Sequence, residues 1–232
     1  MALDFKSMST EKKVTFCGAA LIAALSLIAF IVCLCVPGTQ EAILKASIKA
    51  AKNMSLTDAL SGKLPNVLSG INWTLFLGFV SALAVAAIYY FKELKISLVP
   101  ANVPMKFVVP GIVVLTSLFA WIYLSTGIDI KDGFSGWMAD KGTFWAILLI
   151  LCSLAYICVF VLAILEKKDN ILSALPEILL ALVGFFFLLG AIGGLAFNEE
   201  SESISLVKIS LVLNALCMTG FGVVTCLNEN KQ

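Results

Sequence analysis

The stretch Thr143–Leu165, TFWAILLILCSLAYICVFVLAIL, decides the fold class because its 23 residues contain no charged side chain. A helix needs roughly 20 mostly apolar residues to cross the hydrocarbon core of a bilayer. The pattern does not alternate as a half-buried strand would, and it is too long for a strand. We therefore predict that this stretch is a membrane-spanning helix.

Five other stretches have nearly the same length and character. The whole chain is 60% apolar and only 13% charged, whereas soluble domains are about 45–50% apolar and about 25% charged. We predict an all-α, polytopic integral membrane protein, a bundle of about six transmembrane helices that forms a single membrane domain over residues 1–232. The further predicted spans are Val14–Val36, Trp73–Phe91, Phe107–Leu124, Ile178–Phe197 and Ile209–Leu227.

The longest connection, residues 37–72, is too short for an unaided soluble domain. Within it, Glu41–Lys52 repeats apolar and Lys residues at helical spacing. This pattern predicts an amphipathic helix, either a connector lying on the bundle or a lid that contacts lipid. The first span can alternatively be a cleaved signal peptide, but its 23 residues exceed the usual apolar region of about 7–15, so we expect it to be retained.

Lysine placement predicts the orientation of the bundle. Lysines crowd the helix ends on the side that holds the N-terminus, at Lys12, Lys13, Lys92, Lys95 and Lys167. Positive residues near helix ends favour the cytoplasmic side. We expect both termini to be cytoplasmic and the protein to reside in the plasma membrane.

Missing residue types narrow the chemistry. The chain has no His, and all 16 of its basic residues are Lys, so it also has no Arg. Imidazole-based catalysis and imidazole metal sites are excluded, as are bidentate guanidinium clamps. The net charge of +1 gives no basic field for nucleic acid. We expect a protein that is not an enzyme and that uses no cofactor, metal ion or nucleic acid.

Small residues at four-residue spacing predict close helix packing. Such faces let helix backbones approach each other, within one bundle or between protomers. They suggest a protein partner or a homo-oligomer in addition to the lipid bilayer. The candidate packing residues are Gly78, Ala82 and Ala86 in the second span and Gly184, Gly190 and Gly194 in the fifth.

Three polar residues are candidate membrane sites: Glu177, Lys208 and Asn214. Glu177 and Lys208 directly precede the fifth and sixth predicted spans, so we expect them at opposite interfaces and unable to pair. Only a fifth helix that began near Ile171 would carry Glu177 inside the membrane as a proton or cation site. Asn214 lies six residues into the last span, where an interhelical hydrogen bond is its simplest role. We expect no charged pair within the bundle.

Other candidates are weaker. Pro110 and Gly111 predict a kink in the third helix. Cys33 and Cys35 are candidates for thiol redox chemistry, but a helix points them about 200° apart, so buried thiols are the simpler interpretation. The charged turns after Phe91 and Leu165, each followed by a Pro, also suggest a repeated helical hairpin.

Two classes of function fit these features. The first, which the sequence favours, is a non-catalytic membrane component: a subunit, assembly factor or interaction protein that acts through helix packing. The alternative is a small transporter, channel or facilitator for a small or lipid-like substrate. A membrane thiol-redox protein is a remote third.

Overall fold

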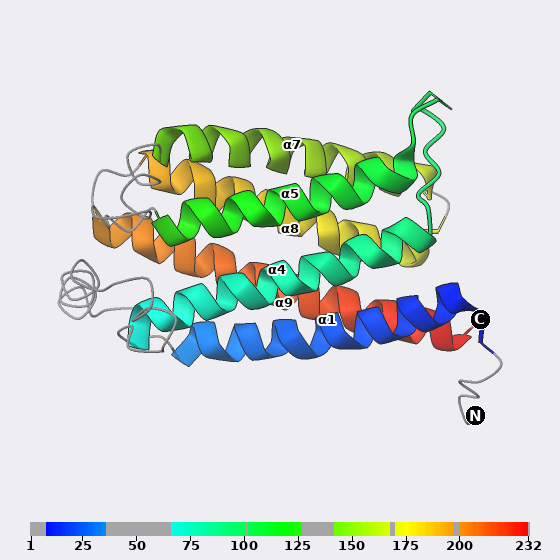
Figure 1. Cartoon of the computed structure of the whole chain (residues 1–232), viewed down its shortest axis with the longest axis horizontal. Helices are drawn as coiled ribbons and strands as arrows, with labels where there is room; N and C mark the ends of the chain where they lie inside the picture. Colours follow the sequence, from blue (N-terminus) through cyan, green and yellow to red (C-terminus); the bar gives the residue numbers. More distant parts are fainter. Residues whose placement is uncertain are drawn as a thin grey trace.

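The chain folds into helices in a computed structural model that describes residues 8–35, 66–100, 102–126, 142–167, 170–196 and 200–231 (Figure 1). Among these residues, six helices are long and apolar enough to cross a membrane. The prediction of an all-α bundle of six membrane helices is confirmed. The elements are α1 (Thr10–Cys35), α4 (Asn66–Phe91), α5 (Met105–Thr126), α7 (Gly142–Glu166), the 3-10 turn η1 (Ile171–Ala174), α8 (Leu175–Ala196) and α9 (Glu200–Lys231).

The six helices form a closed ring in which each helix packs against two ring neighbours. The order around the ring is α1, α4, α5, α7, α8, α9 and back to α1. Two further contacts cross the ring, between α4 and α9 and between α5 and α8. We call α1, α4 and α9, in the lower part of Figure 1, the first half, and α5, α7 and α8, in the upper part, the second half. The halves contact each other along α4 and α5 and along α8 and α9, as extensively as neighbours within a half do.

Helix α1 begins and α9 ends at the same end of the bundle, here called the termini end (Figure 1). The opposite end, the far end, collects aromatic side chains. The rings of Trp73 and Phe76 lie 5.8 Å apart, as do those of Phe76 and Trp121. Tryptophan is typical of membrane interfaces, so this cluster fits the end of a membrane-spanning bundle.

The outer surface of the ring is apolar. Large aliphatic side chains are about half exposed on every part of it, among them Leu27, Leu83, Leu151 and Leu216. A soluble monomer rarely exposes so extended an apolar surface. A bilayer solvates such side chains, so the surface fits the composition of an integral membrane protein.

Several helix ends differ from the predicted spans. Helix α4 begins at Asn66 and not at Trp73, and α9 begins at Glu200 and not at Ile209. The added turns are polar at the start of α9 and mixed polar and apolar at the start of α4, and backbone hydrogen bonds form there whatever the hydropathy of the side chains. The fifth span also starts earlier than predicted, since η1 leads directly into α8 and the apolar segment covers Ile171–Gly193. The amphipathic helix expected over Glu41–Lys52 lies outside the described residues.

Candidate functional site

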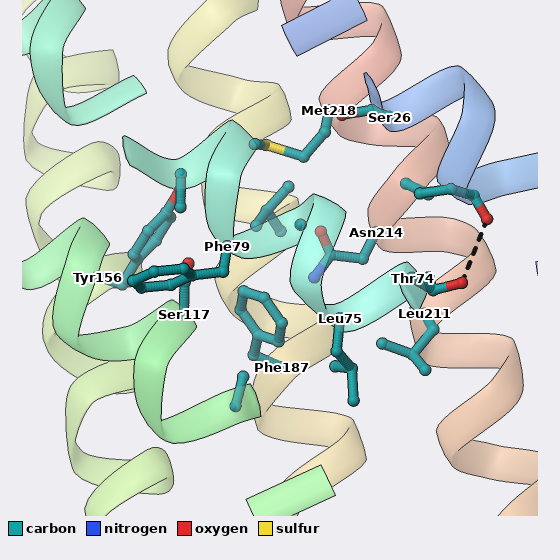
Figure 2. Close-up of a pocket in the computed structure, with 16 residues that line it drawn as sticks. Ser26, Thr74, Leu75, Phe79, Ser117, Tyr156, Phe187, Leu211, Asn214 and Met218 are labelled. Carbon is teal, nitrogen blue, oxygen red and sulfur yellow. Dashed lines mark hydrogen bonds between the residues drawn. The ribbon is translucent and has the colours of Figure 1, made fainter. Parts of the chain in front are cut away.

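A small cavity lies at the centre of the ring and all six helices contribute to its wall (Figure 2). Its volume is about 30 Å³, room for about two water molecules at roughly 10–15 Å³ each. The walls are mainly apolar, but each half supplies hydroxyl groups. The residues that argue for a polar centre are Ser26, Ser117, Tyr156 and Asn214.

Asn214 is the most polar residue of this central cavity. Its side chain is buried in the bundle and lies among Leu75, Phe187 and Met218 (Figure 2). Its amide makes no hydrogen bond to any residue that the structure describes, so the expected interhelical bond is not present among them. A buried amide normally finds a partner. The cavity is therefore a place where water or a solute can supply the missing hydrogen bonds.

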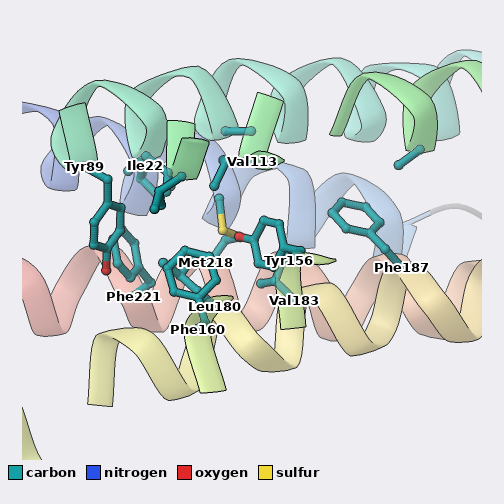
Figure 3. Close-up of a cluster of buried hydrophobic side chains, with 14 of the residues drawn as sticks. Ile22, Tyr89, Val113, Tyr156, Phe160, Leu180, Val183, Phe187, Met218 and Phe221 are labelled. Atoms are coloured by element: carbon teal, nitrogen blue, oxygen red, sulfur yellow. The ribbon is translucent and has the colours of Figure 1, made fainter. Parts of the chain in front are cut away.

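An aromatic layer closes the central cavity toward the termini end (Figure 3). The Tyr89 ring lies 5.5 Å from that of Phe160 and 6.4 Å from that of Phe221. The Phe160 ring in turn lies 4.9 Å from that of Tyr156, which lines the cavity. On α9, Met218 lines the central cavity and Phe221 follows it by about one helical turn. The aromatic layer therefore lies about one turn from the cavity.

A second and larger cavity, here called the vestibule, lies at the termini end on the other side of the aromatic layer. Its volume is about 420 Å³, within the usual range of about 300–1,000 Å³ for small-molecule sites. It is bounded by the end of α4, the turn between α7 and α8, the start of α8 and the end of α9. The charged and polar residues in its wall are Tyr89, Lys92, Lys167, Asn170, Ser173, Glu177, Thr225 and Asn228.

Two ion pairs stand at the vestibule. The Nζ of Lys167 donates to Oε1 of Glu177 at 2.6 Å, and the Nζ of Lys92 donates to Oε1 of Glu229 at 2.9 Å. Both carboxylate side chains are 5% exposed, whereas the Lys side chains are 35% and 45% exposed. The expectation that the bundle holds no charged pair is therefore wrong at the termini end. Glu177 does not pair with Lys208, as predicted, because Lys208 lies beside Cys33 at the far end.

The position of Glu177 follows from the early start of the fifth membrane segment. Asn170 caps η1 by accepting a hydrogen bond from the Ser173 backbone N–H at 3.3 Å. Pro176 in the first turn of α8 needs no backbone partner. Together they set Glu177 inside the segment Ile171–Gly193, where the hydroxyl of Tyr89 also donates to its Oε1 at 3.4 Å.

The predicted packing glycines of α8 are used inside the bundle. A Cβ on Gly184 would lie 2.8 Å from Tyr156 Cδ1 of α7, and one on Gly193 would overlap Leu206 of α9. A Cβ on Gly190 would contact Leu124 and Ser210 at 3.7 Å. The surroundings of Gly194 are not among the described features. These faces therefore join the helices of one chain to each other.

The predicted packing face of α4 has a different role at Gly78. A Cβ there would meet nothing within 4 Å, and the residue lines the central cavity beside Ala82. Gly78 therefore widens the cavity and makes no close helix contact. Ala82 and Ala86 are buried, as a packing face requires.

The candidate cysteines and the candidate kink residues form no functional site among the described residues. Cys33 is buried and Cys35 is exposed, both as free thiols, in agreement with their predicted separation around the helix. Helix α5 continues through Pro110, and a Cβ on Gly111 would meet nothing within 4 Å. The kink at these residues stays a prediction.

The sequence interpretation did not identify five residues that the structure makes important: Tyr89, Lys92, Lys167, Thr225 and Glu229. A signal for two of them was present. Asn214, Thr225 and Glu229 are spaced by eleven and four residues, about three turns and one turn, so they share one face of the last helix. A polar stripe on an otherwise apolar helix would have indicated an axial face.

Comparison of the chain with known protein families, curated proteins and solved structures finds no match. The functional conclusion therefore rests on the geometry of the bundle.

Proposed function

We propose that this protein is a small, non-catalytic membrane transporter or facilitator whose path follows the axis of the six-helix ring. The observation that carries the proposal is the central cavity, which all six helices line and into which the unpaired amide of Asn214 projects. Polar groups buried in a membrane bundle are costly and commonly mark substrate or ion pathways. The vestibule is then the entrance from the termini end.

The distribution of hydrogen bonds supports movement of the two halves against each other. Ser26 donates to Ser81 within the first half, and Thr116 donates to the Cys152 carbonyl within the second. The junction between the halves is mainly apolar, and the 3.4 Å bond from Tyr89 to Glu177 crosses it at the termini end. Rocking of two bundles about a central site is a common transport mechanism. We therefore assign the aromatic layer and this hydrogen bond to a gate.

The orientation is part of the same proposal. Lysines near helix ends favour a cytoplasmic termini end, so the vestibule opens toward the cytoplasm and the membrane is the plasma membrane. The alternative, a membrane component that binds a partner through small-residue faces, has less support. The faces around Gly184 and Gly190 are already filled by α7, α5 and α9 of the same chain.

Flux through proteoliposomes tests this function. The purified chain is reconstituted alone, and entry of labelled rubidium, chloride, glycerol and L-leucine is measured against protein-free vesicles. We expect at least one of these solutes to enter faster with protein present. Replacing Asn214 by Leu is expected to slow that flux about fivefold, since a typical net hydrogen bond contributes about 1 kcal/mol.

The matched control is Leu216→Ala, because Leu216 lies on the same helix at nearly the same depth but faces outward. This variant should leave the flux unchanged. Entry no faster than in protein-free vesicles for every probe contradicts the proposal, as does equal loss in the two variants.

A further inference from the structure

Two buried polar atoms in the vestibule wall have no partner. Glu177 Oε2 and Thr225 Oγ1 are both inaccessible to solvent and make no hydrogen bond in the part of the chain that the structure describes. Their residues are 4% and 6% exposed, and both line the same cavity. Buried carboxylate oxygens normally accept hydrogen bonds, and an unpaired one is costly. Because solvent does not reach either atom, a ligand with N–H or O–H donors contacts them only when the side chains of the vestibule wall move aside, and it then supplies the missing hydrogen bond.

The ammonium groups at the vestibule have donors to spare. Lys92 and Lys167 each carry three N–H donors. Lys92 gives one to Glu229, and Lys167 contacts Glu177 and, at 3.4 Å, the Ser173 carbonyl. Both side chains are partly exposed at the vestibule wall. Lys92 in particular can also donate to an anionic group of a ligand.

The charges of the two pairs balance. Lys92, Lys167 and Glu177 line the vestibule, and Glu229, the partner of Lys92, does not, so the wall offers partners of both signs. A ligand with both signs uses both kinds of group: its ammonium group meets Glu177 Oε2 and Thr225, and its anionic group meets Lys92. Charged hydrogen bonds of this kind are about twice as strong as neutral ones.

Four apolar residues also line the vestibule and suit an aliphatic side chain. Ile88, Leu172, Pro176 and Phe221 lie around the polar groups. The volume of about 420 Å³ leaves room for such a side chain beside the charged part of the ligand.

We propose that the vestibule binds a small zwitterion with a primary ammonium group, an α-amino acid with an aliphatic side chain. This inference rests on the proposed function and names its substrate class. The ammonium group replaces the missing donor at Glu177, while the carboxylate of the ligand adds a second partner to Lys92. The side chain packs on the apolar wall below the aromatic layer.

Binding is measured on the purified chain in detergent by isothermal titration calorimetry with three matched probes. L-Leucine carries both charged groups, 3-methylbutylamine lacks the carboxylate, and 4-methylpentanoate lacks the amine. We expect L-leucine to bind and each analogue to bind about tenfold more weakly or worse, because each loses one charged hydrogen bond. Equal binding of either analogue overturns the zwitterion, since the site would then accept a simple cation or anion.

Two variants locate the site. Glu177→Gln and Thr225→Val should each weaken L-leucine binding, the first about tenfold or more and the second less because a neutral hydrogen bond is lost. Thr225→Val keeps the side-chain shape and serves as the second test if Glu177→Gln does not fold. Glu93→Gln, at an exposed carboxylate of the same end, should change nothing. Unchanged binding in both vestibule variants overturns the site.

This binding measurement needs no transport. Absence of L-leucine binding, with flux of another solute intact, overturns the ligand class and leaves the transport function standing. L-leucine binding without flux of any probe overturns the transport function alone.

Discussion

The contact between α9 and α1 depends on Gly222, and Gly222→Ala tests it. A Cβ on Gly222 would lie 2.6 Å from the Ala19 carbonyl oxygen and 2.6 Å from the Ala23 nitrogen. Both are backbone atoms of α1, so neither can rotate away as the end of a side chain can. A Cβ in ordinary van der Waals contact lies at least 3.4 Å from its neighbours, so the two helices must move apart by about 0.8 Å.

The expected cost follows from that separation. A gap of about 0.5–1 Å forfeits a quarter to a half of the dispersion energy of the contacting atoms, and overpacking a core typically costs about 1–3 kcal/mol. Alanine also gains about 1 kcal/mol over glycine in a helix interior. We therefore expect Gly222→Ala to lower the free energy of unfolding by up to about 2 kcal/mol.

Gly220→Ala is the matched control. A Cβ there would lie 3.4 Å from Leu179 Cδ1, an ordinary contact with a side chain. Both variants gain the same helix propensity, so the difference between them isolates the overlap at α1 and is expected to be about 1–3 kcal/mol. Unfolding in SDS, followed by tryptophan fluorescence in mixed micelles, measures it. A Gly222→Ala variant as stable as Gly220→Ala would refute the close packing of α9 on α1.

The remaining predictions concern the buried carboxylate of Glu177 and the two free thiols at the end of α1. Lys167→Met should destabilise the protein by roughly 1–3 kcal/mol in the same assay, because it leaves the buried Glu177 carboxylate without its closest donor. Lys95→Met, at an exposed site, should change stability little. Equal effects of the two substitutions would contradict the ion pair. N-Ethylmaleimide should label the exposed Cys35 in the folded protein and the buried Cys33 only after unfolding, as read by peptide mass spectrometry; equal labelling in the folded protein would contradict the burial of Cys33.

The six membrane helices could be predicted because their signal is local. A run such as Thr143–Leu165 specifies its state by its length and apolar character alone. Helix ends were less predictable, since α9 begins with a polar turn and α4 with turns that mix polar and apolar residues, and hydropathy does not distinguish such turns from a loop. Hydropathy alone does not distinguish a start of the fifth segment at Ile171 from one at Ile178, and the start at Ile171 determines where Glu177 lies.

The residues of the candidate site were predicted only in part. Asn214 and Glu177 were found because a strongly polar residue near an apolar run is conspicuous. Lys167 and Lys92 were assigned to the interface, since a sequence does not show that the exposed end of one helix reaches a carboxylate on another. Gly222 was missed because it belongs to no repeated small-residue pattern, and its importance comes from the backbone of α1 that faces it.

If the ring axis is a transport path, water must reach position 214 from outside the bundle, and this access can be measured. Single cysteines at Asn214 and at Leu216, in a chain whose seven native cysteines are replaced, are exposed in proteoliposomes to a charged methanethiosulfonate reagent. The account predicts that the Asn214→Cys thiol reacts as the path opens, while the Leu216→Cys thiol, which faces lipid, does not. An unreactive thiol at position 214, in protein that unfolds as the native chain does, would contradict the path.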